Sequence, residues 1–291
     1  MTGNPVVPPK LSLNQATIKH ADLAQAIAVT RGAGIGSIGL WREPVAEVGL
    51  TKAAELVADS GLRVSSLCRG GFFTALEGSA RRASLDDNRA AIDETATLAA
   101  AGAPGSASVL VLVAGGLPAG SRDLAGARER VRDAIGELEP AARASGVTLA
   151  IEPLHPMFAA DRAVVSTLEQ AIDIAEQFPV ESVGVVVDTF HVWWDPAVFV
   201  QIARAGAGGR IATYQVCDWL APLPADVLLG RGMMGDGHID FEPLTQAVAA
   251  AGYRGDVEVE IFNQAVWDAD PAEVAALTVR KFAEHLPSLW A

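Results

Sequence analysis

Short apolar runs typical of β-strands alternate with longer helical stretches along the whole 291-residue chain. Several of the helical stretches stop at a glycine, such as Gly61, Gly146 and Gly252, which is a frequent residue just past a helix end. Eight strand–helix units in about 290 residues are typical of a (β/α)8 barrel with parallel strands. We expect strands at 11–17, 38–42, 63–73, 108–114, 147–154, 183–191, 210–218 and 256–262. The helices are expected at 21–31, 45–60, 85–101, 122–145, 166–178, 196–205, 241–251 and 271–285.

A doubly wound sheet is the alternative that such alternation leaves open. That fold would need a glycine-rich phosphate turn after an early strand. Gly32, Gly34 and Gly36 instead precede the second expected strand, and we interpret them as a helix-to-strand turn. No linker, repeat or charge run divides the chain. We therefore expect residues 1–291 to form a single α/β domain, a (β/α)8 TIM barrel.

Charge and composition exclude several classes of partner. The chain has 35 acidic and 22 basic residues, a net charge of −13, whereas nucleic acids and anionic membranes require a basic face. Residues 1–10 lack the apolar segment of a signal peptide, and the uncharged stretch 95–121 is broken by prolines and glycines. Cys68 and Cys217 are expected to be small core residues. We expect a cytoplasmic protein with no nucleic-acid or membrane partner.

Polar side chains lie where four neighbouring strands of the expected barrel end, which is where barrel enzymes place their active sites. Glu152, Asp188 and Glu260 each follow apolar strand residues, and Gln215 adds an amide oxygen. A buried carboxylate is costly unless it is paired or binds a metal. An oxygen-only set suits a hard ion, so we expect one Mn²⁺ or Mg²⁺ per chain, held by these four residues.

Two expectations about charge accompany this metal site. Three carboxylates around a dication leave one net negative charge, so no cationic side chain is expected among them. Glu258 shares the strand face of Glu260 by the period of two, one layer deeper, and we expect it to form a structural ion pair.

A family resemblance is carried by five segments of the C-terminal half. They are IEPLH (151–155), VDTFHVWWD (187–195), YQVCDW (214–219), GMMGDGHIDF (232–241) and GYRGDVEVEIF (252–262). Together they resemble the xylose-isomerase-like TIM barrels of the sugar phosphate isomerase/epimerase superfamily. The resemblance implies that Glu152, Asp188, Gln215 and Glu260 bind a metal, that His191 and Arg231 contact substrate, and that the chain forms a homodimer or homotetramer. Most members carry histidine where this chain has Gln215, and hydroxypyruvate-isomerase-like members resemble it there.

The expected function is a divalent-metal-dependent isomerase or epimerase of a small sugar or keto-sugar. Such an enzyme removes a proton next to a carbonyl and proceeds through a metal-stabilised enediolate. Glu152 and Glu260 could approach opposite faces of the substrate as bases. His191, just past the sixth strand, could hydrogen-bond the oxygen that becomes negative, and His155 is a further candidate base.

The substrate-binding candidates lie at expected strand ends and in one loop. Arg231 occupies a glycine-rich loop and could bind a hydroxyl, carboxylate or phosphate group, or be a solvated loop residue. Trp41, Trp194 and Arg69 lie at or just beyond expected strand ends and could contact a sugar or pack the loops around it.

Three other functions remain as alternatives. A lyase, either a dehydratase or a 3-keto-glycoside eliminase, could use the same site with His155 as an extra base. An endonuclease-IV-like repair enzyme would need more than the five histidines present and a basic groove. A non-catalytic sugar-binding barrel would not need Glu260.

Overall fold

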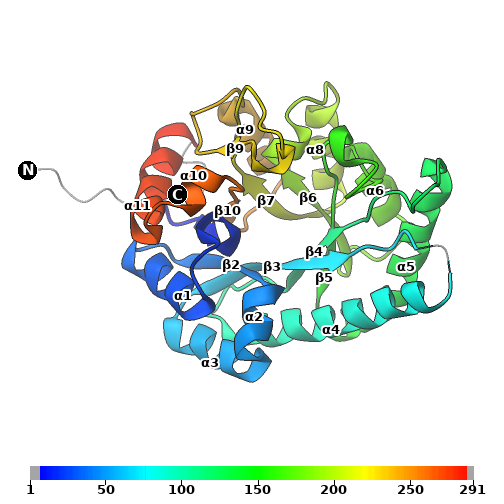
Figure 1. Ribbon diagram of the computed structural model, residues 1–291, viewed down its shortest axis with the longest axis horizontal. Helices are drawn as coiled ribbons and strands as arrows, with labels where there is room; N and C mark the ends of the chain where they lie inside the picture. Colours follow the sequence, from blue (N-terminus) through cyan, green and yellow to red (C-terminus); the bar gives the residue numbers. More distant parts are fainter. Residues whose placement is uncertain (1–6, 76, 287–291) are drawn as a thin grey trace, which may run out of the picture.

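Eight parallel strands close into a barrel in the computed structural model, which describes residues 7–75 and 77–286. Strand β1 pairs with β2 on one side and with β10 on the other, and these two pairings close the ring. Figure 1 shows the strands at the centre with helices around them, and this confirms the expected (β/α)8 barrel. The strands in order around the barrel are β1 (Leu11–Asn14), β2 (Ser37–Trp41), β3 (Arg63–Gly71), β4 (Val109–Val113), β5 (Thr148–Glu152), β6 (Val183–Asp188), β7 (Ile211–Val216) and β10 (Val257–Val259).

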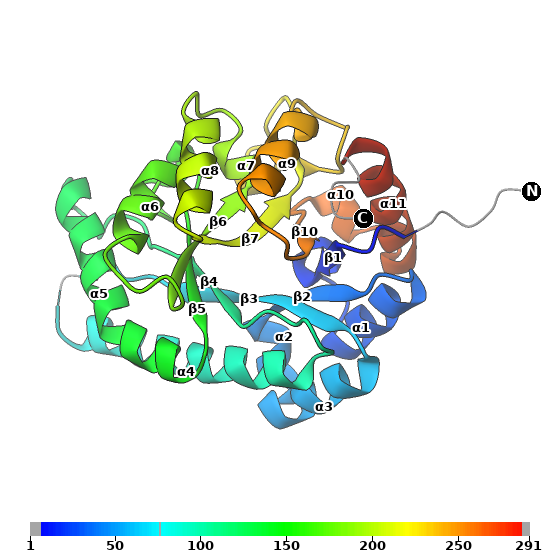
Figure 2. The ribbon, with the colours of Figure 1, turned by 180° about the vertical axis from the view of Figure 1, so that it is seen from behind.

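The helices surround the barrel, as the two opposite views in Figures 1 and 2 show. Their bounds are α1 (Leu23–Gly32), α2 (Arg42–Val48), α3 (Leu50–Ser60), α4 (Ser79–Ala101), α5 (Leu124–Ala144), α6 (Leu168–Ala175), α7 (Thr189–Val192), α8 (Val198–Ala207), α9 (Phe241–Ala250), α10 (Gln264–Trp267) and α11 (Pro271–His285). The expected single helix at 45–60 was wrong: α2 and α3 are joined at Gly49, whose φ of 82° lies outside the helical region.

Several strands end earlier than the sequence pattern predicted, because a polar side chain turns the chain. The first strand ends at Asn14, whose Oδ1 accepts a hydrogen bond from the Ala16 backbone N–H at 2.8 Å and starts the 3-10 helix η1 (Gln15–Ile18). The sixth ends at Asp188, whose Oδ1 accepts from the Phe190 N–H at 2.8 Å and starts α7. These turns bring residues that were expected within strands to the carboxyl end of the barrel.

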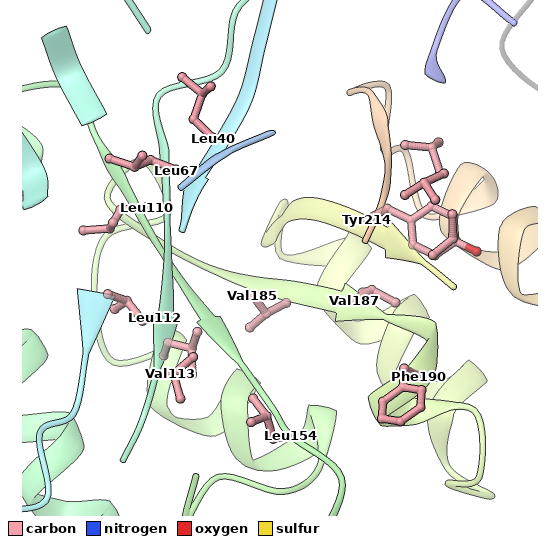
Figure 3. Packing of buried hydrophobic residues seen from close by; sticks show 14 of the residues in the cluster. Leu40, Leu67, Leu110, Leu112, Val113, Leu154, Val185, Val187, Phe190 and Tyr214 are labelled. Carbon is pink, nitrogen blue, oxygen red and sulfur yellow. The ribbon is translucent and has the colours of Figure 1, made fainter. Parts of the chain in front are cut away.

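Inward and outward side chains of the strands form separate apolar clusters. The larger cluster packs the strands against the helices, and Figure 3 shows some of its members, including Val185 and Val187. Since successive strand side chains point to opposite faces, Asp188 and Glu152 share the inward face with members of the smaller cluster. That smaller cluster consists of Cys68, Val109, Val111, Ala150 and Val186. The carboxylates therefore lie inside the barrel, above an apolar layer.

A short hairpin follows β7 and was not expected from the sequence, which predicted one strand through residue 218. Strand β8 (Asp218–Trp219) pairs antiparallel with β9 (Arg231–Gly232). The buried Asp218 carboxylate accepts hydrogen bonds from the backbone N–H groups of Gly235 (2.9 Å), Gly237 (2.8 Å) and Ile239 (2.9 Å). This hairpin returns Arg231 to the barrel end.

The uncharged stretch 95–121 contains the end of α4, a turn and strand β4. Within residues 7–75 and 77–286, no helix is both long enough and apolar enough to cross a membrane.

Candidate active site at the carboxyl end of the barrel

A cavity of about 640 Å³ opens at the carboxyl ends of the strands, a volume typical of small-molecule sites. The buried ionisable side chains of its lining are Cys68, Glu152, His191, Arg231 and Glu260. Aromatic side chains form much of the remaining wall, namely Trp41, Phe72, Phe262 and Trp267. The cavity thus combines a polar, charged floor with apolar walls.

Arg231 lies among the predicted metal ligands and is only 3% exposed. Its Nη1 lies 2.9 Å from Oε2 of Glu260 and 3.1 Å from Oδ2 of Asp188, and its Nη2 lies 3.1 Å from Nε2 of His191. The expectation that no cationic side chain stands among the carboxylates was therefore wrong. The physical reason is that buried carboxylates this close together need a positive charge, and the guanidinium supplies one.

The three carboxylates remain short of positive charge even with Arg231 present. Burial, together with the neighbouring Glu260, raises the pKa of Glu152 well above its usual value. Burial also raises the pKa of Asp188, although Arg231 opposes this. The pKa of Glu260 rises to about 8, mainly through burial. Carboxylates in this state favour either protons or an additional cation.

The residues present fit a hard divalent ion. Glu152, Asp188 and His191 each offer a ligand atom, and these atoms lie within 4.8 Å of one another. Gln215 is 1% exposed, and its Oε1 has no hydrogen-bond partner among the residues that the structure describes. Gln215 is paired with Asp188 in the register of β6 and β7, and an orphaned buried oxygen there matches the oxygen-rich ligand sets of Mg²⁺ and Mn²⁺.

Glu258 lies one layer deeper and is fully buried, at 0% exposure. Its carboxylate accepts hydrogen bonds from Asn14 Nδ2 (2.6 Å), Gln215 Nε2 (2.9 Å), Ser66 Oγ (2.9 Å) and Ser65 Oγ. The expected ion pair was wrong, because four neutral donors from β1, β3 and β7 satisfy this carboxylate instead. One of these donors, the amide nitrogen of Gln215, belongs to a predicted metal ligand, although neither Gln215 nor Asp188 is among the residues that line the cavity.

His191 is buried, and a backbone hydrogen bond to Nδ1 places the proton of the neutral ring on Nε2. Its Nδ1 accepts a hydrogen bond from the His155 backbone N–H at 3.0 Å, while Nε2 faces Arg231. Burial and the neighbouring guanidinium lower the pKa of His191 well below its usual value, so the ring is neutral near pH 7. A neutral imidazole beside a permanent cation is suited to holding a substrate oxygen.

His155 and Trp194 lie apart from the cavity. The His155 ring packs against Trp219 and Trp194, with centroids 5.0 and 5.3 Å away, and its Nδ1 accepts from the Met157 backbone N–H. The Trp194 indole donates from Nε1 to the His191 carbonyl at 2.8 Å. Neither ring belongs to the described lining of the cavity. The sequence analysis had suggested His155 as a base and Trp194 as a substrate contact. The structure brings neither side chain to the cavity.

Trp41 and Arg69 do line the cavity. Trp41 Nε1 donates to Oδ1 of Asn14 at 2.8 Å, which fixes the indole. The Arg69 guanidinium lies over the Trp41 and Phe72 rings, 5.6 and 5.0 Å from their centroids, with Glu43 at 3.8 Å. Arg69 is thus held by cation–π contacts at the wall rather than by a close ion pair.

Gln15 and Phe262 also line the cavity and were not singled out by the sequence analysis. Gln15 directly follows β1, so it has the same strand-end position as the predicted ligands. The interpretation of 11–17 as one strand concealed that signal. Phe262 follows Glu260 by two residues, and its ring lies 4.9 Å from the Arg231 guanidinium.

Residues 27–284 match the family model of the xylose isomerase-like TIM barrel. The chain belongs to this family, as the five sequence segments had indicated.

Individual relatives extend this result. The crystal structure of protein SMc04130 from Sinorhizobium meliloti 1021 is 47% identical, covers 95% of this chain and 98% of that chain, and superposes with a TM-score of 0.90. An L-ribulose 3-epimerase of Mesorhizobium japonicum is 25% identical over 280 residues, which span 93% of this chain and 86% of the relative. The IolI protein, solved with a bound zinc atom, is 21% identical, covers 94% of this chain and 97% of that chain, and shares the fold with a TM-score of 0.79.

Proposed function

We propose that this protein is a divalent-metal-dependent epimerase or isomerase of a small sugar or keto-sugar. The observation that carries the proposal is the pair of cavity-lining glutamates, Glu152 and Glu260, which stand on strands separated by β6 and β7. Both carboxylates line the same cavity, so they could take a proton from, and return one to, a carbon of a sugar bound there. The relatives named as sugar epimerases and isomerases support the same reaction class.

Glu152, Asp188, Gln215 and Glu260 would hold the metal, for which we propose Mn²⁺ or Mg²⁺ because all four offer oxygen. When bound, the ion would polarise the substrate carbonyl and stabilise negative charge on its oxygen. The zinc atom bound in the IolI structure, which shares this fold, supports the proposal of a metal.

The side chains of the chain itself would move the proton. One glutamate takes the proton from the carbon next to the carbonyl, and the electron pair of that C–H bond shifts toward the carbonyl oxygen. Return of a proton to the opposite face of the same carbon gives an epimer, while return to the adjacent carbon gives the isomer. Arg231 and the neutral His191 would hold the substrate oxygens, and the aromatic walls would exclude water.

The lyase alternative would use the same enolising site, with His155 as a plausible extra base. Because the His155 ring packs against Trp194 and Trp219 outside the cavity, the structure does not place it as a base for elimination.

Deuterium exchange tests the proposal directly. Purified protein, stripped of metal and reloaded with Mn²⁺ or Mg²⁺, is incubated in D2O with a panel of ketoses and keto-sugars. We expect deuterium at the carbon next to the carbonyl, together with an epimer or isomer, and loss of exchange in Glu152→Gln and Glu260→Gln. Glu129→Gln, an exposed substitution on α5, is the matched control and should exchange like the wild type. A metal-loaded wild type that exchanges no sugar would contradict the proposal.

A further inference from the structure

Gln15 is a buried side chain of the cavity whose hydrogen-bonding groups are unused. It is 2% exposed and lines the cavity from the first turn after β1. Neither Oε1 nor Nε2 has a hydrogen-bond partner within the described part of the chain. A buried amide without partners lowers stability, so its retention at a cavity wall indicates a partner that enters the cavity.

The groups around Gln15 are, by contrast, fully engaged. Thr17 donates from Oγ1 to the Val259 carbonyl and accepts from the Ile261 backbone N–H, both at 2.9 Å. Trp267 Nε1 donates to the Ala16 carbonyl at 2.7 Å. These bonds, with the Asn14 cap on Ala16, hold the turn in place and leave only the Gln15 amide free to bind a ligand.

The position of Gln15 in the barrel places it away from Glu152. Strand β1 pairs with β10, which leads into Glu260, whereas β5, which ends in Glu152, is four strands from β1 in either direction. In Figures 1 and 2 the chain after β1 lies beside β10 and α10. A ligand spanning the cavity would therefore meet Gln15 beyond Glu260, at the end remote from Glu152.

The charges of the outer lining balance. Lys19, Arg69 and Arg162 are matched by Glu43, Glu47 and Asp226. The Lys19 ammonium lies over the Trp267 ring, 4.4 Å from its centroid, and Arg69 lies over Trp41 and Phe72. A balanced outer lining with aromatic walls fits a neutral sugar better than a phosphorylated one.

We propose, building on the proposed function, that Gln15 is a specificity-determining residue that hydrogen-bonds a hydroxyl group of an unphosphorylated sugar, a hydroxyl remote from the carbon that exchanges its proton. The amide can donate from Nε2 and accept at Oε1, which matches the dual character of a hydroxyl. Discrimination then arises because a sugar lacking this hydroxyl leaves the amide unpartnered.

The first experiment compares Gln15→Met with the wild type, both loaded with Mn²⁺. The control is Gln201→Met, a buried glutamine on α8 that does not line the cavity. Without sugar, Gln15→Met should melt at the same temperature as the wild type or higher, because an unpartnered amide is lost. With the sugar found by deuterium exchange, Gln15→Met should raise KM at least about tenfold, whereas Gln201→Met should leave KM unchanged.

The second experiment measures the binding of sugar analogues, first to the wild type and then to Gln15→Met. Monodeoxy analogues of the active sugar are tested for protection against thermal unfolding. One analogue, deoxygenated away from the exchanging carbon, should bind at least about tenfold more weakly than the parent sugar. Gln15→Met should bind that analogue and the parent equally.

The outcomes separate this proposal from the function on which it rests. A wild type that neither exchanges deuterium into any sugar nor binds one contradicts the proposed function. A sugar-free Gln15→Met that melts at a lower temperature than the wild type contradicts the observation that the Gln15 amide is unpartnered. An active wild type with unchanged KM in Gln15→Met overturns the assignment of Gln15. Tighter binding of the phosphorylated than of the free sugar overturns the substrate class.

Discussion

Gln215 donates from its amide nitrogen to Oε1 of Glu258 over 2.9 Å, and this contact decides which end of the amide faces away from Glu258. Three other donors, from Asn14, Ser65 and Ser66, also face this carboxylate, so the NH2 group faces Glu258 and the oxygen faces away from it. That oxygen is the orphaned Oε1 beside the buried carboxylates. Glu258 thus orients a proposed metal ligand without lying among the ligands itself, a role often filled by the outer shell of a metal site.

Glu258→Gln should weaken divalent metal binding about 10- to 100-fold, because the substituted amide has one acceptor oxygen instead of two for the four donors and can turn its own NH2 group toward Gln215. Isothermal titration of the metal-free protein with Mn²⁺ measures this. The same substitution at the exposed Glu129 serves as the control. Unchanged Mn²⁺ affinity in Glu258→Gln would show that Glu258 does not orient Gln215 for metal binding.

Gln215→His should retain metal binding. A neutral histidine can donate one ring N–H to Glu258 and present its other nitrogen to the metal, reproducing both functions of the amide. Gln215→Leu, which can do neither, should lose the metal and leave Glu258 with one donor fewer. Metal content by elemental analysis after dialysis distinguishes the variants, and equal metal content in the leucine variant would argue against Gln215 as a ligand.

The metal-free protein should lose stability as the pH rises from about 4.5 to about 8. The pKa of Glu260 is raised from 4.5 to about 8, so the folded state binds more protons than the unfolded state within this range. The contribution is present below pH 4.5 and declines by at most about 1.4 kcal/mol per pH unit as the pH rises toward 8. Urea unfolding of the wild type and Glu260→Gln at several pH values tests this, and the variant should show the shallower slope. Parallel slopes would contradict a raised pKa at Glu260.

Arg231→Met should destabilise the metal-free protein by about 3–5 kcal/mol near pH 8, because Asp188 and Glu260 are left without the buried cation. Near pH 5 the loss should be smaller, since burial raises the pKa of both carboxylates and favours their protonation. Arg204→Met is the matched control: Arg204 also pairs with two carboxylates, Asp173 and Glu176, but at the surface, and should cost less than about 1 kcal/mol. Equal losses for the two variants would show that burial does not set the strength of the Arg231 pairs.

The alternation of strands and helices predicted the barrel, because each unit is encoded by neighbouring residues. The same local pattern located Glu152, Asp188, Gln215 and Glu260, since a polar residue after an apolar strand stands out in the sequence. The ends of the elements were less predictable, because single side chains set them. Asn14 ends β1 earlier than expected, although α11 has the predicted bounds.

Contacts across the barrel could not be predicted in this way. The donors to Glu258 include Asn14, 244 positions away, and Ser66, 192 positions away. Arg231 reaches Asp188 because an unexpected hairpin returns the chain. His155 follows Glu152 by three residues, yet its ring turns toward Trp219, a direction that only the packed structure determines.

The Asp218 carboxylate, which binds three backbone N–H groups of the segment 235–239, has a consequence for how such a protein diversifies. Because this carboxylate anchors the base of the hairpin, the exposed tip at 221–226 can change in length and composition without moving Arg231. Asp226, Leu228 and Leu229 of the same hairpin line the cavity. Evolution can therefore reshape the entrance, and with it the range of ligands that fit, while Arg231 and the carboxylates it contacts stay where they are.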